Sequence, residues 1–222
     1  MQFDDVIETR RSVHQYADDD IDDDTLREIV ERATFAPSSY NLQPWEFLVL
    51  RDDETQRTLR EVAYGQEHVT DAAAVVVVLG NLDPSAHADR VVRDKFEKGY
   101  LPSEDVLESQ LETIERRAEG PREDRRRWTV QSSTLAAMAL MHAAWNRGVA
   151  SCPMGGFDGD ALREAFDVGD GYEPVLLVTL GYPAEDAPDL ERPRKLRRPV
   201  EEVVHFESFD PAVRTDAPRA DD

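Results

Sequence analysis

Residues 72–79 read AAAVVVVL, and this stretch decides the class of fold. β-branched residues favour strands, and a run with no polar alternation predicts a strand buried on both faces. On either side of it in the sequence, residues 47–50 (FLVL) and 174–181 (PVLLVTLG) predict two further strands. Residues 54–64 predict a helix between the strands at 47–50 and 72–79. The sequence therefore predicts a mixed α and β protein.

Several helices are expected around these strands. Residues 3–10 predict a short helix, and the acidic run at residues 22–25 predicts the start of a second one, because such residues cap helix N-termini. Asp158 is expected to cap another helix that contains Leu162 and Phe166. Residues 128–145, WTVQSSTLAAMALMHAAW, are apolar nearly all round, which predicts a helix covered in part by another subunit.

We expect one domain over residues 1–210 of the 222-residue chain. Residues 83–127 are charged and carry glycine and proline, so we interpret them as a peripheral excursion, with a helix at 106–118, that is a candidate substrate cover. Residues 211–222 are expected to form a disordered tail. No secretion signal or apolar membrane span is visible, which predicts a cytoplasmic protein.

Acidic residues dominate the charge of the chain. There are 26 Lys and Arg against 47 Asp and Glu, a formal net charge of −21, which argues against nucleic acid and anionic membranes as partners. The only lysines are Lys95, Lys98 and Lys195. An acidic, lysine-poor surface indicates adaptation to high salt, the alternative being an acidic protein from a GC-rich genome.

Cysteine and histidine give no sign of a metal centre in the sequence. Cys152 is the only cysteine, so no internal disulfide is available, and we expect it to be a small buried side chain. The five histidines show no HExxH spacing, and no catalytic Ser/His/Asp or Cys/His pattern is visible. The sequence therefore predicts neither a metal site nor a covalent nucleophile.

Three other stretches point to a ligand. Arginines gather at residues 10–14 (RRSVH) and, with Lys195, at residues 192–198, which predicts a phosphate site, the alternative being local balance of acids. Residues 36–45, APSSYNLQPW, combine prolines with hydroxyl and amide groups suited to a polar ligand. Gly155 and Gly156 would let the backbone approach a planar ligand, or form an ordinary turn. GxGxxG and GxxxxGK[ST] motifs are absent.

Taken together, the motifs RRSVHQY, APSSYNLQPWEFLVL, AYGQEHVTDAAAVVVVLG, GVASCPMGGF, VLLVTLGYP and KLRRPVEEVVH resemble, in their order and spacing, the FMN-dependent nitroreductase family. The resemblance extends from residue 4 to about residue 205. It implies an α+β fold with a mostly antiparallel central sheet wrapped by helices, a domain completed by homodimerisation, and two FMN molecules at the dimer interface.

The same resemblance implies roles for individual residues. Those matching the FMN phosphate site are Arg10, with Arg11 beside it, Ser12, Lys195 and Arg197. His14 stands where the family usually has Arg or Lys at the pyrimidine edge of the flavin. The remaining contacts implied are Pro37, Ser38, Ser39, Gln66, Pro153, Met154, Gly155 and Gly156, with Asn41 and Gln43 coming from the partner subunit.

The activity implied is hydride transfer from NADH or NADPH through flavin N5 to a small organic acceptor such as a nitroaromatic, a quinone or an enone. No side chain is expected to be a catalytic nucleophile. The alternatives are a flavin-consuming or dehalogenating enzyme of the same fold, a non-catalytic flavin-binding protein, and a structural dimer whose basic clusters only balance acids.

Overall fold

The computed structural model describes residues 1–209. The described residues divide into two compact units, of which the first is Met1–Glu191 and the second begins at Arg192. The elements of the first unit are α1 (Phe3–Thr9), α2 (Asp23–Ala33), the 3-10 turn η1 (Ser39–Asn41), β1 (Trp45–Leu50), α3 (Asp53–Val62), α4 (His68–Asp71), β2 (Ala74–Asn81), α5 (Ala88–Glu97), α6 (Glu104–Ala118), α7 (Arg122–Trp145), β3 (Ala150–Met154), α8 (Gly159–Ala165), β4 (Tyr172–Gly181) and α9 (Pro188–Glu191). The second unit contains α10 (Val200–Val203).

The sheet has the strand order β1-β2-β4-β3, and all three pairings are antiparallel. The expected α+β fold with a mostly antiparallel sheet is therefore confirmed. β2 is buried from Ala74 to Gly80, as the valine run predicts. β4 begins at Tyr172, ahead of the predicted residue 174, because a register shift between Val78 and Leu79 admits Pro174 to the ladder.

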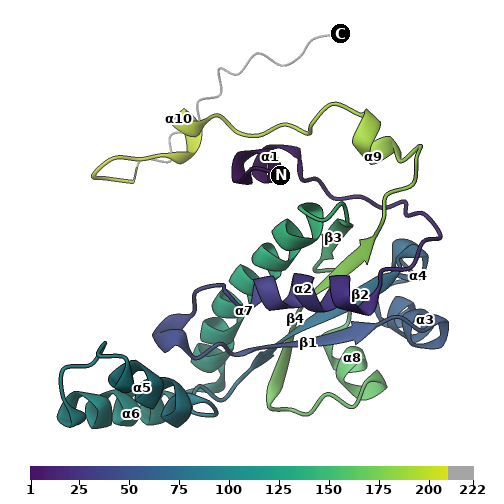
Figure 1. Ribbon diagram of the computed structural model, residues 1–222. Helices are drawn as coiled ribbons and strands as arrows, with labels where there is room; N and C mark the ends of the chain where they lie inside the picture. Colours follow the sequence, from purple (N-terminus) through teal and green to yellow (C-terminus); the bar gives the residue numbers. More distant parts are fainter. Residues whose placement is uncertain (210–222) are drawn as a thin grey trace. The chain divides into compact units, whose positions relative to one another are not determined.

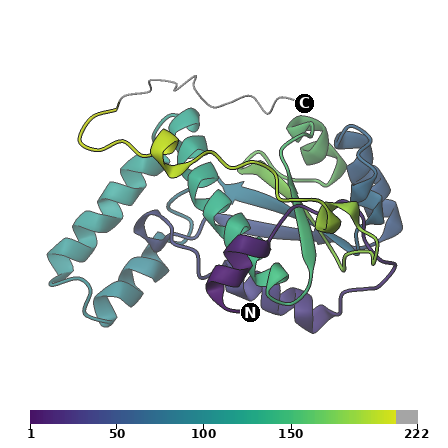
Figure 2. The ribbon, with the colours of Figure 1, turned by 90° about the horizontal axis from the view of Figure 1, so that it is seen from above.

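Alternate residues of β2 enter two different cores. Val76 and Val78 pack with α2 and α7, whereas Val75 and Val77 pack with Leu59 of α3 and with residues of α4 and α8. Figures 1 and 2 show these helices covering the two faces of the sheet. The unbroken apolar run thus reflects a strand with helices on both sides.

Several helices differ from the sequence-based expectation. α7 begins at Arg122 rather than at Trp128, since Pro121 and the acidic residues Glu123 and Asp124 supply a helix start. Short or highly charged helices were not predicted, namely α4, α5, α9 and α10. In α8, Asp158 caps as expected, accepting hydrogen bonds from two backbone N–H groups, but Phe166 lies just beyond the last helical residue.

The expected excursion is a helical pair. α5 and α6 form a small core of their own, with Val92, Leu107 and Ile114 buried against Leu42. Figure 1 shows the pair extending away from the sheet. The part of the chain that the structure describes contains no helix long and apolar enough to cross a membrane. The tail predicted at residues 211–222 lies outside the described residues, and the domain limit at residue 210 stays a prediction.

Candidate active site

The segment after α1 lies along β3. Ser12 forms a parallel bridge with Ser151, and the backbone N–H of Val13 donates to Ser151 O at 3.2 Å. Further along, Tyr16 bridges Pro183. Two stretches that the sequence singles out, residues 10–14 and 153–156, are therefore neighbours in space.

The glycine pair follows directly after β3. A Cβ added to Gly155 would meet no atom within 4 Å, and one added to Gly156 would have Gln66 Nε2 as its nearest neighbour at 3.7 Å. The Gln66 amide donates to Gly156 O at 2.8 Å and to Ala63 O at 2.9 Å. The structure thus joins Gln66 to the glycine pair, which presents an open stretch of backbone.

The loop that contains residues 37–44 is stabilised by hydrogen bonds between its own residues. Tyr40, Asn41 and Gln43 all have positive φ, between 48° and 62°. The Gln43 backbone N–H donates to Ser38 Oγ at 2.9 Å, and Gln43 Nε2 donates to Asn41 O at 3.1 Å. Part of the polar density in this loop therefore stabilises a strained turn, a role that composition alone does not reveal.

A hollow of about 430 Å³ lies between this loop, α6 and α7. Its lining residues are Pro37, Ser38, Ser39, Arg117, Asp124, Arg127, Trp128, Gln131, Ser132 and Leu135. Among the described residues, this lining includes none of the group around Gly155, so the predicted ligand residues form two separate groups on the first unit.

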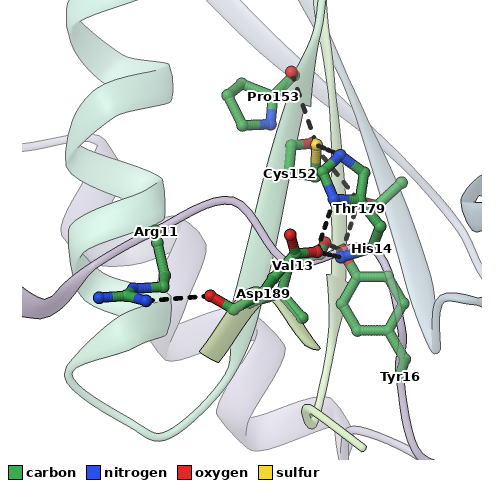
Figure 3. Close-up of polar contacts among 8 residues, drawn as sticks. All are labelled: Arg11, Val13, His14, Tyr16, Cys152, Pro153, Thr179 and Asp189. Carbon is green, nitrogen blue, oxygen red and sulfur yellow. Dashed lines mark hydrogen bonds and ion pairs between the residues drawn. The ribbon is translucent and has the colours of Figure 1, made fainter. Parts of the chain in front are cut away.

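Arg11 and His14 are both held by α9. His14 Nδ1 lies 2.8 Å from Asp189 Oδ2, which also accepts from the His14 backbone N–H at 3.1 Å. Arg11 Nη1 donates to Asp189 O at 3.0 Å. Figure 3 shows these contacts and, on the other side of the imidazole, Cys152, whose Sγ lies 3.4 Å from His14 Nε2.

Sequence reasoning missed this contact set. Cys152 is buried, as expected, but it faces a histidine, which the spacing of His14 and Cys152 along the chain could not indicate. Asp189 carries no motif signal, because it lies in a short helix that the pattern did not predict. The sequence could have suggested only that residues 10–14 and 151–153 belong to one site.

Burial shifts several pKa values in this region. Burial of the Tyr16 phenol raises its pKa well above the usual range, and its hydroxyl donates to Val13 O at 2.7 Å. Burial, followed by an electrostatic contribution from the neighbouring His14, lowers the pKa of His68. Burial also lowers the pKa of His142, with Arg10 adding to the effect. Neutral side chains are therefore favoured here.

Lys195 and Arg197 lie in the second unit, where both are exposed. Arg197 Nη1 donates to the backbone oxygens of Lys195 and Leu196. Their predicted meeting with Arg10 at one phosphate stays a prediction.

Comparison with known proteins finds relatives along most of the chain. The model of the nitroreductase family matches residues 7–182. The NADH dehydrogenase of Thermus thermophilus is 37% identical over 179 residues, which cover 80% of this chain and 84% of that protein. YodC of Bacillus subtilis, a candidate NAD(P)H nitroreductase, is 33% identical over 186 residues, which cover 82% of this chain and 90% of that protein. A candidate nitroreductase of Exiguobacterium sibiricum, solved in complex with FMN, has a TM-score of 0.81 and 31% identity, covering 93% of this chain and 98% of its own.

Proposed function

The chain belongs to the nitroreductase family, and on this premise we propose that it is an FMN-dependent oxidoreductase that uses NADH or NADPH to reduce a small organic acceptor. The acceptors that we propose are nitroaromatics, quinones and enones. Membership of an oxidoreductase family makes the chain an enzyme, and the identity of the donor and the acceptor is the part that we infer.

One observation carries the proposal. The segment that contains Arg10 and Ser12 lies along β3, and β3 ends at Gly155 and Gly156, to which Gln66 is bonded. The resemblance assigns the first pair to a phosphate and the others to a flavin ring. A phosphate site and a ring site on adjacent backbone segments are what an elongated phosphorylated cofactor requires.

The residues present fit FMN. Arg10 and Ser12 would hold the phosphate through charge-assisted hydrogen bonds. Both donors of the Gln66 amide are used by Ala63 O and Gly156 O, which makes its Oε1 the atom that would accept from an N–H of the ring. The open backbone of Gly155 would allow a flat ring to approach closely. When bound, FMN supplies two-electron transfer between a nicotinamide and an organic acceptor.

We further propose a homodimer whose partner copy supplies Asn41 and Gln43. α7 carries Leu135, 49% exposed, and Met138, 38% exposed, beside the hollow lined by Ser38 and Ser39. Large apolar side chains that stay exposed on a long central helix support burial against a second copy. This arrangement would also bring the loop to the glycine side of the neighbouring copy.

The proposed activity can be tested on the purified protein. We expect a yellow protein that releases about one FMN per chain and that oxidises NADH or NADPH in the steady state with a quinone acceptor. FAD in place of FMN, or no flavin uptake after incubation with FMN, would contradict the proposal. Flavin binding without turnover would indicate a non-catalytic flavin protein, and stoichiometric loss of FMN would indicate a flavin-consuming enzyme.

A further inference from the structure

Two side chains that the proposed function does not require, His68 and Cys152, come together with His14, which the resemblance places at the edge of the flavin. His14 lies between Ser12 and Tyr16, which form the two isolated bridges of this segment, His68 is the first residue of α4, and Cys152 lies in β3. One nitrogen of each imidazole and the Cys152 sulfur all lie within 4.8 Å of one another. Imidazole and thiolate are the ligands that zinc prefers.

His14 is oriented by a carboxylate. Asp189 Oδ2 lies 2.8 Å from His14 Nδ1, and Nε2 on the other side of the ring lies 3.4 Å from Cys152 Sγ (Figure 3). A histidine that gives one N–H to a carboxylate and turns its other nitrogen to an ion is the usual arrangement in zinc proteins. The imidazole of His14 is thus prepared as a ligand.

His68 has an unused nitrogen. Its Nε2 is buried and makes no hydrogen bond within the described residues. The ring stands edge to face with that of His14, with 5.0 Å between centroids and 88° between planes. A buried polar nitrogen without a partner is costly unless a ligand satisfies it.

We propose that His14, His68 and Cys152 bind one Zn²⁺, with Asp189 positioning His14 and a water molecule as the fourth ligand. Zinc bond lengths at a tetrahedral angle place a nitrogen and a sulfur ligand about 3.6 Å apart, close to the separation of His14 and Cys152. A movement of about 1 Å by one imidazole ring would bring the most widely separated pair of ligand atoms to a distance that one zinc ion can bridge. On binding, a sulfur–zinc bond forms, the thiol proton passes to solvent, and nothing is oxidised or reduced.

The exposure of His14 to solvent and the metal preference of the three ligands both agree with a zinc site. The His14 side chain is 39% exposed, which gives an ion and a water molecule a route from solvent. One thiolate and two imidazoles favour zinc over magnesium or calcium, which take oxygen ligands. The ion would fasten the segment after α1 to α4 and β3.

Cobalt is the probe that tests the site. The untagged protein is stripped with a chelator and titrated with Co²⁺ in high salt, which screens the many surface carboxylates. We expect a thiolate-to-cobalt charge-transfer band and tetrahedral d–d bands beyond the flavin absorption, saturating at one ion per chain and lost when Zn²⁺ is added. Cys152 is the only cysteine, so the charge-transfer band can come from no other residue.

Three variants decide the ligands. Cys152→Ser should abolish the charge-transfer band, and His68→Gln should weaken Co²⁺ binding at least tenfold. The matched control is His142→Gln, because His142 Nε2 is also buried without a hydrogen-bond partner in the described chain, but His142 is outside the cluster. It should bind Co²⁺ like the parent.

A second readout covers variants that fold poorly. Zn²⁺ should raise the melting temperature of the parent, because a ligand of the folded state stabilises it, and should leave that of Cys152→Ser unchanged. The proposal is overturned if the parent gives no thiolate band, or if His68→Gln binds as tightly as the parent. Flavin content is measured on the same samples, so a failure here is distinguishable from a failure of the proposed function.

Discussion

Gly181 shows how one residue fixes the entry of the N-terminal segment into the fold. A Cβ at this position would lie 2.6 Å from the ring of Tyr16. The ring can therefore lie against the end of β4, where its hydroxyl is 2.7 Å from Thr179 Oγ1 and donates to Val13 O. Because Val13 is itself bonded to β3, this contact holds residues 10–14 at the proposed site.

His142 gives a prediction about acid stability. Burial, together with the charge of Arg10, lowers its pKa below the ordinary 6.5. As the pH falls below 6.5, the unfolded chain takes up a proton that the folded chain binds less strongly, so the free energy of unfolding falls. We expect the parent to lose more stability than His142→Gln between about pH 7.5 and pH 5. Urea unfolding across this range is the measurement, and parallel curves for the two proteins would contradict the assignment.

At the scale of elements, β2 and α7 approach each other closely at Gly80. A Cβ on Gly80 would lie 2.5 Å from Thr129 Oγ1 and 2.9 Å from its Cγ2. Thr129 is fully buried, and its hydroxyl has no hydrogen-bond partner within the described residues. Glycine at this position therefore sets how closely the helix approaches the strand.

We predict that Gly80→Ala lowers the free energy of unfolding by about 1 to 3 kcal/mol through overpacking. In a Thr129→Ala background, which removes the two nearest atoms and leaves Ser133 Oγ at 3.2 Å, the same change should cost less. Gly155→Ala is the matched control, because a Cβ there meets nothing within 4 Å. Denaturant unfolding of the double-mutant cycle measures the coupling, and additive effects would show that Thr129 is not the obstacle.

The elements that the sequence predicted are those whose burial pattern is local. β2 and the buried part of α7 could be predicted because apolar residues occupy both faces of the strand and most of the surface of the helix. α5 could not, since its apolar residues, such as Ala88 and Val92, are set among charges and pack in a small core with α6 and Leu42. The helix α5 is therefore stabilised by contacts with α6, outside the main core.

The candidate site likewise contains residues that sequence motifs point to and contacts that no motif indicates. Residues 10–14, Gln66 and the glycine pair belong to motifs with a recognisable spacing, and their assignment to the flavin stays a prediction. The approach of His14 to Cys152 and Asp189 could not, because it depends on how the segment after α1 lies between β3 and α9. Contacts between isolated residues of distant segments leave no periodic pattern in a sequence.

At the scale of the whole molecule, the resemblance assigns both Arg10 and Arg197 to the FMN phosphate. Arg10→Ala and Arg197→Ala should each weaken FMN binding about tenfold or more, because each removes a charge-assisted contact of about 1.5 to 3 kcal/mol. If both arginines bind one phosphate, the effects should be non-additive in the double variant. Arg57→Ala is the control, since Arg57 is an exposed partner of Asp53 on α3. Fluorescence titration with FMN measures all four proteins, and unchanged affinity in both single variants would contradict the assignment.

The last prediction concerns the proposed dimer. A subunit charge of −21 opposes association, so light scattering should be recorded in high salt, where the Debye length falls to about 3 Å at 1 M. We expect a dimer for the parent and a monomer for Leu135→Asp, because a carboxylate at the centre of an apolar interface would be buried without a partner. Val106→Asp on α6 is the matched control, since Val106 is also an exposed aliphatic residue but lies away from the hollow beside Ser38 and Ser39. If Asn41 and Gln43 complete the flavin site of the other copy, the Leu135→Asp monomer should also lose FMN, whereas Val106→Asp should retain it. A folded monomer of the parent that holds FMN in high salt would show that one chain suffices for the site.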